Sequence, residues 1–306
     1  MTAHPKMDPQ TGEMLFFGYM VDGPFSAGMS YQAVDATGRL TRSERFDAPY
    51  ASMVHDFITT DRHVIFPIFP LTGSLDRAMR GEPPFAWEAD RPTCIGVMNR
   101  DGTAADMRWF ETDPCYVFHP MNAYSDGDMI VAHVMQFEEA PLFPHADGSR
   151  PDPQKANARL CEWRIDLGDN ARGVERRYVD DITGEFPRLD ERFAGLEYRF
   201  GYYGAATARN GGLGFDAVVR HDFATGSRDQ YTLPAGDATG EPVFVPRTPD
   251  APEGQGYLLS VIYRAAENRS DLAVFDAESL AAGPVALAEL PHRVPFGFHG
   301  NWKYND

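Results

Sequence analysis

The sequence predicts an all-β protein formed by one domain over residues 1–306. Two observations support this: short stretches carry apolar residues at alternate positions, and turn residues are abundant, with 28 Gly and 24 Pro. Alternation with a period of two places one set of side chains on one face of a strand. The sequence contains no linker, low-complexity tract or charge block that would divide it. A propeller and a large sandwich both fit this pattern.

Nine stretches have the composition of strands, rich in Val, Ile, Phe and Tyr and bounded by Gly, Pro, Asp or Asn. In chain order they are MLFFGYM (14–20), HVIFPIFPL (63–71), CYVFH (115–119), DMIVAHVMQF (128–137), ARLCEWRID (158–166), DAVVRHDF (216–223), EPVFVPR (241–247), GYLLSVIY (256–263) and DLAVFDA (271–277). The best helix signal is SLDRAMRG, where Ser74 is the expected N-cap and Gly81 the expected stop.

A small turn unit recurs between these stretches. Its Asp accepts a hydrogen bond from the backbone two residues on, and its Gly supplies the positive φ of a tight turn. The unit therefore predicts antiparallel hairpins, although its spacing is irregular. It occurs as DPQTG (8–12), DATG (35–38), DITG (181–184), DFATG (222–226) and DATG (237–240).

Charge and cysteine content exclude several classes of protein. Lys and Arg number 28 against 45 Asp and Glu, a net charge of −17, which repels nucleic acid and anionic membrane surfaces. Three widely spaced cysteines without a CxxC pair favour a reducing cytoplasm over a disulfide framework. The sequence has no run of eighteen apolar residues, so we expect no transmembrane segment. It does not indicate an oligomeric state.

Four of the nine histidines share a setting beside Pro, Gly or Asp. They are His4 in TAHPK, His55 in MVHDF, His119 in VFHPMNAY and His299 in FGFHGNW. Alternation predicts that Met53 and Phe57 share a strand face with His55, and that Cys115 and Val117 share one with His119.

Buried imidazoles need partners. The gaps of 51, 64 and 180 residues between the four fit no local zinc motif. Either the fold brings these histidines to one metal ion, or they are ordinary core and surface residues. His63, His133, His145, His221 and His292 lack the shared setting and are expected to be ordinary.

Five motifs, in this order, resemble those of the carotenoid cleavage oxygenases: TAHPKMDPQTGE, MVHDFITT, HPMNAYSDGD, GEPVFVPR and RVPFGFHGNW. The stretches APYASMVHDF and FAWEADRPTCIGVMNRDG resemble the bacterial branch that includes lignostilbene dioxygenases. The resemblance covers the entire chain. It implies a seven-bladed β-propeller with one non-haem Fe(2+) on its axis, held by His4, His55, His119 and His299.

The same resemblance implies a departure from the family. In relatives the first histidine lies well inside the chain, so this sequence is expected to be N-terminally truncated and to form an incomplete ring without the N-terminal blade region. Unpaired strand edges would then favour aggregation, so we expect the chain to express poorly and to cleave little substrate.

Carboxylates that accept the second ring N–H of a ligand histidine fix its orientation. The resemblance assigns this role to Glu185 in GEFPRL and Glu241 in GEPVFVP, while a third family glutamate, upstream of the first histidine, has no counterpart. The implied reaction is O2-dependent cleavage of a conjugated C=C bond, in an apocarotenoid or a stilbene, to two carbonyl products. Phe57, Phe296 and Phe298 are candidates for lining the apolar substrate tunnel, with core packing as the alternative.

Two other functions stay open. An incomplete ring could be an inactive remnant or a binding module without iron. A metal-dependent propeller hydrolase of the lactonase type is the second alternative, but it would need a carboxylate-rich ligand set.

Overall fold

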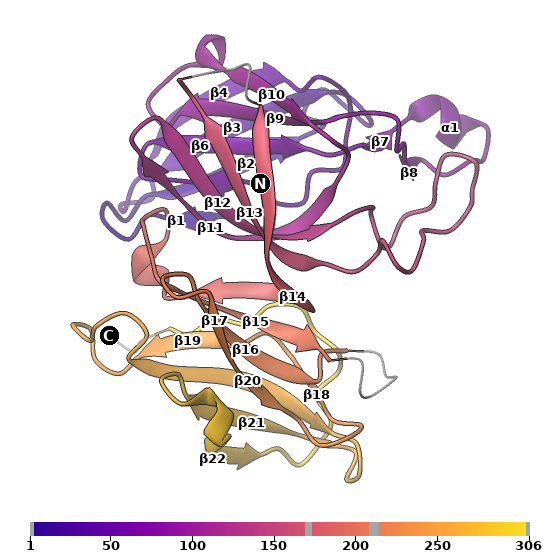
Figure 1. The fold of residues 1–306 in the computed structure, drawn as a ribbon. Helices are drawn as coiled ribbons and strands as arrows, with labels where there is room; N and C mark the ends of the chain where they lie inside the picture. The colour runs from indigo at the N-terminus through magenta and orange to yellow at the C-terminus, as the bar shows by residue number, and fades with distance from the viewer. Residues whose placement is uncertain (1–2, 169–172, 208–213, 304–306) are drawn as a thin grey trace. The chain divides into compact units, whose positions relative to one another are not determined.

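The structure, a computed structural model, describes residues 3–168, 173–207 and 214–303. The chain forms two compact units (Figure 1). Unit 1 comprises Met1–Tyr178 and Ala194–Glu197, and unit 2 comprises Val179–Phe193 and Tyr198–Asp306. Among the described residues no helix has the length and apolar character needed to cross a bilayer.

Unit 1 contains two four-stranded antiparallel sheets. The first has the order β1–β2–β3–β4, and the second the order β10–β9–β6–β5. The strands of the first are β1 (Lys6–Met7), β2 (Met14–Tyr19), β3 (Gly28–Val34) and β4 (Leu40–Asp47). Those of the second are β5 (Ile58–Thr59), β6 (His63–Ile68), β9 (Thr93–Asn99) and β10 (Arg108–Thr112), with the 3-10 turn η1 (Ala104–Asp106) before β10.

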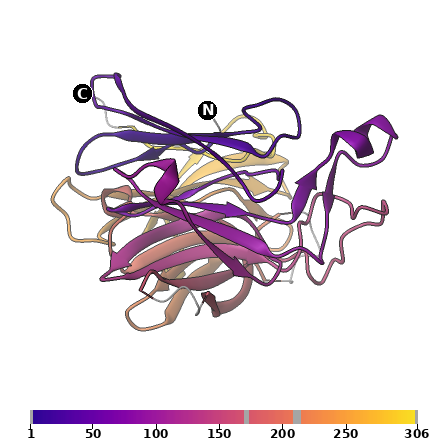
Figure 2. The same ribbon diagram turned by 90° about the horizontal axis from the view of Figure 1, so that it is seen from above.

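Three longer antiparallel strands follow in unit 1. They are β11 (Tyr116–Asp126), β12 (Met129–Phe137) and β13 (Arg159–Asp166). A small arm formed by β7 (Leu71–Gly73), α1 (Leu75–Met79) and β8 (Phe85–Trp87) projects from the sheets of this unit in both views (Figures 1 and 2). The helix prediction is confirmed, because the Ser74 hydroxyl accepts the Arg77 N–H at 3.2 Å and caps α1.

The core of unit 1 follows the predicted alternation. Leu15 and Phe17 of β2 are buried against Tyr31 of β3, while the alternate residues Met14, Phe16 and Gly18 are partly exposed. Phe57 stacks on Phe66 with 5.9 Å between ring centroids. The Phe66 ring of β6 also lies 6.3 Å from that of Phe17 and 6.2 Å from that of Tyr31, so these rings join the two four-stranded sheets.

Unit 2 is built of antiparallel strands as well. Strand β14 (Val174–Leu189) begins in the last residues of unit 1 and continues into unit 2, where it pairs with β15. The strands that follow are β15 (Phe200–Ala206), β16 (Ala217–Asp222), β17 (Ser227–Thr232), β18 (Ala238–Thr239), β19 (Val243–Pro246), β20 (Gly256–Arg264), β21 (Arg269–Asp276) and β22 (Pro284–Glu289). Two 3-10 turns, η3 (Glu191–Phe193) and η4 (Leu280–Ala282), connect them.

The core of unit 2 lies between the β15–β16 hairpin and the β20–β21 hairpin. Tyr202 stacks on Phe244 at 5.3 Å, and both pack with the buried residues Leu258 and Phe275. The prediction of an all-β chain is confirmed, and each of the nine predicted stretches contains a strand.

The hairpin prediction from the recurring turn unit is confirmed at 8–12, 35–38 and 222–226 and wrong at the two other places. At 181–184 the unit lies inside β14, where a Cβ on Gly184 would come within 2.6 Å of the Tyr203 ring. This glycine therefore allows close strand approach rather than a turn. At 237–240, Asp237 accepts hydrogen bonds from Arg264 and the Ala265 N–H, 27 and 28 residues away, so it does not form its own local turn.

Candidate metal centre

Three of the four singled-out histidines meet in unit 1. Nε2 of His55 lies 3.0 Å from Nε2 of His4 and 3.2 Å from Nε2 of His119. One ligand nitrogen from each of the three lies within 4.8 Å of the others. His119 is buried, and the other two rings are partly buried. Residues 51 and 64 positions apart in sequence thus bring their ring nitrogens close to one another.

Each of the three histidines lies where regular strand structure is interrupted. His4 precedes β1, and Pro5 restricts its backbone to extended conformations. His119 lies within β11 at a bulge, a register shift between Val117 and Pro120. Such irregularities let a sheet turn a side chain toward a site that its regular faces do not reach.

The predicted strand around His55 is wrong. Residues 53–57 form no strand, and β5 begins only at Ile58. The Asp56 carboxylate accepts the N–H of Phe57 at 2.7 Å, a local hydrogen bond that replaces a ladder contact. Met53 and Phe57 therefore do not share a strand face with His55.

An ion pair lies directly beside the three histidines. Nζ of Lys6 lies 2.8 Å from each carboxylate oxygen of Asp56, whose side chain is 4% exposed. Burial raises the pKa of Asp56, and the charge of Lys6 lowers it without cancelling the effect. Neither residue was predicted from the sequence, although each lies within two positions of a candidate ligand.

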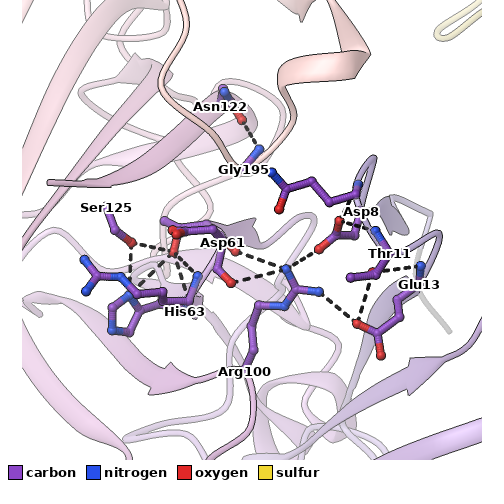
Figure 3. A network of polar contacts seen from close by, with 12 residues as sticks. Asp8, Thr11, Glu13, Asp61, His63, Arg100, Asn122, Ser125 and Gly195 are labelled. Atoms are coloured by element: carbon purple, nitrogen blue, oxygen red, sulfur yellow. Dashed lines mark hydrogen bonds and ion pairs between the residues drawn. The ribbon is translucent and has the colours of Figure 1, made fainter.

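A second set of polar contacts holds the segment after His4 to the segment after His55 (Figure 3). The Arg100 guanidinium donates to the carboxylates of Asp8 and Glu13. It also contacts the backbone oxygens of Thr60 and Asp61, each at 3.5 Å. Arg100 thus joins the β1–β2 turn to the turn after β5.

The same network continues to the strand that carries His119. The Ser125 hydroxyl donates to the Thr60 hydroxyl at 2.9 Å, and the Asn122 side chain accepts the Gly195 N–H at 2.8 Å (Figure 3). Gly195 in turn accepts the N–H of Asp61 at 2.9 Å through its carbonyl. The segments of all three histidines are therefore linked by polar contacts within unit 1.

Aromatic side chains border the cluster on one side. Phe118 is partly buried, and its ring lies edge-on to His55 with 5.3 Å between centroids and 6.1 Å from His119. Phe118 was not predicted from the sequence, although it is adjacent to His119. Phe57 lies in the core cluster of unit 1 and is fully buried.

His299 lies in unit 2, together with Glu241. Oε1 of Glu241 lies 3.1 Å from Nδ1 of His299, and Oε2 accepts the Gly300 N–H at 2.9 Å. Arg188 donates to Oε2 of Glu241 at 3.0 Å and to the Gly300 carbonyl at 2.8 Å. Burial raises the pKa of Glu241, but its bond to His299 and the charge of Arg188 outweigh burial and hold the pKa below its usual value.

Strand β14 also contacts His299, through Phe186. A register shift between Glu185 and Arg188 marks a bulge, and Phe186 within it has a φ of 58°. The Phe186 ring lies edge-on to His299 at 5.5 Å. The Glu185 carboxylate accepts the N–H of Phe186 at 2.5 Å. Of the two predicted glutamates, Glu241 therefore contacts a candidate ligand within its own unit.

A hollow of about 590 Å³ lies in unit 2 between the C-terminal segment and the β18–β21 strands. Its lining includes Phe296 and Phe298, both strongly exposed, together with His299, Leu259 and Val261. A hollow of this size with mostly apolar walls can take up a small apolar molecule.

The five remaining histidines are engaged elsewhere. His133, His145 and His221 lie 3.3–3.5 Å from carboxylates, and His63 lies 3.3 Å from the Ser125 hydroxyl. The carbonyl of His292 accepts the Ser270 N–H at 3.2 Å. The described residues bring none of these five into a group that could hold a metal ion.

Comparison with known proteins gives consistent matches. Residues 1–304 match the family described as "RPE65: Retinal pigment epithelial membrane protein". The chain is 40% identical to isoeugenol monooxygenase of Pseudomonas putida and 36% identical to lignostilbene-alpha,beta-dioxygenase isozyme III of Sphingomonas paucimobilis. The matches cover 99% and 98% of this chain but only 65% and 64% of those proteins.

Solved structures agree with this pattern. The lignostilbene dioxygenase of Pseudomonas brassicacearum superposes with a TM-score of 0.95 at 34% identity, over 99% of this chain and 66% of that one. Cobalt-substituted Synechocystis ACO gives a TM-score of 0.86 at 26% identity, over 99% and 65%. The chain thus spans about two thirds of the length of the proteins it matches, and the predicted fold class is confirmed.

Proposed function

The chain belongs to the family of RPE65 and the carotenoid cleavage oxygenases, and we propose that it acts as a non-haem Fe(II) dioxygenase. In this proposal it cleaves a conjugated C=C bond of a stilbene-type or apocarotenoid substrate to two carbonyl products. The observation that carries the proposal is the cluster of His4, His55 and His119, whose nitrogens face one another at 3.0 and 3.2 Å.

The spacing of these nitrogens fits a bound divalent metal. Imidazole nitrogens bind such ions at ~2.0–2.2 Å, and two of them at a right angle around one ion would be separated by ~3.0 Å. Neutral imidazole is a suitable ligand for iron, as it is for several other first-row metals. Bound iron would supply the site at which O2 is activated.

We propose that His299 is the fourth ligand, with one Fe(2+) per chain. Glu241 supports this assignment, because a carboxylate at Nδ1 favours the tautomer that carries its proton there and leaves the Nε2 lone pair for a metal. Arg188 supports it as well, since it binds both Glu241 and the Gly300 carbonyl and restrains the segment of His299. Glu185 is proposed as a second supporting carboxylate. In this proposal the two units form one catalytic domain.

The substrate class follows from the relatives and the apolar surfaces. The matched proteins are named for isoeugenol and lignostilbene, both phenolic conjugated alkenes. Phe118 beside the histidines, and Phe296 and Phe298 in the hollow of unit 2, offer aromatic surface for such a molecule. We place the protein in the cytoplasm, which its three free, buried cysteines favour.

The test is anaerobic reconstitution with Fe(2+), metal analysis, and exposure to isoeugenol, a hydroxystilbene and an apocarotenoid under 18O2. The proposal expects about one iron per chain and, in the small amount of product expected from this chain, 18O in the carbonyl groups. His119→Ala serves as the inactive control. A chain that binds no divalent metal would leave the three imidazoles as a hydrogen-bonded cluster and contradict the proposal.

A further inference from the structure

We propose that the Lys6–Asp56 ion pair is a positioning device that fixes His4 against His55 and thereby sets the metal affinity of the cluster. The inference rests on the proposed metal site and adds two residues to it. Lys6 follows His4 by two positions, and Asp56 directly follows His55. All four side chains belong to unit 1.

These four residues close a short ring of contacts. On one side Nε2 of His4 lies 3.0 Å from Nε2 of His55, and on the other Nζ of Lys6 lies 2.8 Å from both oxygens of Asp56. Only Pro5 lies between His4 and Lys6, and His55 and Asp56 are adjacent in sequence. A shift of either backbone would therefore move a histidine nitrogen directly.

Regular secondary structure does little to hold either segment. Strand β1 contributes two paired residues, Lys6 with Leu15 and Met7 with Met14, and His4 lies outside it. Residues 53–57 form no strand. The ion pair therefore supplies a specific contact across two segments that the sheet ladder leaves poorly restrained.

Stability alone is a weak explanation for this ion pair. A buried pair is often no more stable than an apolar pair of similar volume, because desolvation offsets the charge attraction. The Asp56 side chain, 4% exposed, therefore bears a large desolvation cost. An ion pair fixes the direction and register of the two segments that it joins, which an apolar contact does not. A metal site needs this because its ligand nitrogens must be held to within fractions of an ångström.

The experiment separates positioning from stability. Lys6→Met leaves Asp56 buried without its cation and is expected to lower the urea midpoint. The double variant Lys6→Met/Asp56→Asn removes both charges, keeps similar shapes and retains an oxygen for the Phe57 N–H, so its midpoint should return toward that of the parent. Its dissociation constant for Co2+, measured by visible absorption, should still rise about 10-fold or more.

Two further variants complete the design. Lys6→Arg keeps the charge and the donors and should retain most of the Co2+ affinity. Arg77→Met/Glu88→Gln removes another ion pair of unit 1, 3.1 Å long and remote from the three histidines in sequence, and should leave Co2+ affinity unchanged.

A stable double variant that binds Co2+ as tightly as the parent would overturn the positioning role while leaving the proposed function intact. A parent chain that binds no Co2+ would overturn both.

Discussion

Oε1 of Glu241 lies 3.1 Å from Nδ1 of His299, while Oε2 of the same carboxylate accepts the next backbone N–H, that of Gly300, at 2.9 Å. One side chain thus fixes both the ring and the backbone that carries it. Arg188 binds the same carboxylate at 3.0 Å and partly neutralises it. His299 is therefore held in one orientation and one tautomer.

Replacing Glu241 with Gln should weaken metal binding. The amide keeps the size of the side chain but loses the negative charge that supports His299, so the affinity for Co2+ should fall ~10–100-fold. The measurement is a titration followed by visible absorption. Glu267→Gln, at a carboxylate whose side chain is 58% exposed, is the matched control and should bind as the parent does. Equal affinities in the two variants would remove Glu241 from the site.

Replacing His119 with Ala should abolish tight metal binding. This residue provides one of the three converging nitrogens, and losing a ligand should cost more than the ~100-fold upper range for losing a ligand's supporting partner. The control is His145→Ala, at a histidine 3.5 Å from Glu139 and outside the cluster. Metal content after dialysis distinguishes the two. Loss of metal in the His145 variant alone would place the site elsewhere.

Replacing Phe57 with Ala should destabilise the fold, whereas replacing Phe298 with Ala should not. Phe57 is 0% exposed and stacks on Phe66, so Phe57→Ala should lower the free energy of unfolding by about 3–5 kcal/mol. Phe298 is 76% exposed, so Phe298→Ala should change it by less than about 0.5 kcal/mol. Urea unfolding measures both. If Phe298 lines the substrate path, its variant should raise KM while stability stays unchanged.

Glu162 should contribute to acid sensitivity. Its contact with His133, 3.5 Å long, is the largest influence on its pKa, and together with Arg177 this contact outweighs burial and holds the pKa at about 2, below the ordinary 4.5. As the pH falls, the Glu162 carboxylate takes up a proton at a higher pH in the unfolded chain than in the folded one. The contribution of Glu162 to the stability of the fold is therefore complete above pH 4.5 and is lost as the pH falls toward 2.

The variant Glu162→Gln should therefore lose less stability than the parent between about pH 5 and about pH 2, by about 1 kcal/mol after screening by solvent. Urea unfolding across this range is the measurement. Glu138→Gln, at a side chain 52% exposed, should follow the parent profile. An unchanged pH profile in the Glu162 variant would show that the contact with His133 does not stabilise the fold.

The sequence by itself determined the strands of the core and the identity of the candidate ligands. Alternation in MLFFGYM places Leu15 and Phe17 inside, because a strand's two faces meet different environments. Ser74 and Gly81 bound the short helix, since capping depends on adjacent residues. The shared setting of His4, His55 and His119 singled them out, and the motifs around them carried the resemblance.

Only the tertiary structure decided how those residues are used. The same Asp-to-Gly unit makes a turn at 35–38 and a strand at 181–184, because the Tyr203 ring lies against Gly184. His55 lies in an irregular segment because Asp56 binds the adjacent backbone and a lysine 50 residues away. Local propensity for a helix or strand depends on neighbours in sequence. The pairing of Lys6 with Asp56, like that of His4 with His55, depends instead on long-range packing, which no short stretch of sequence encodes.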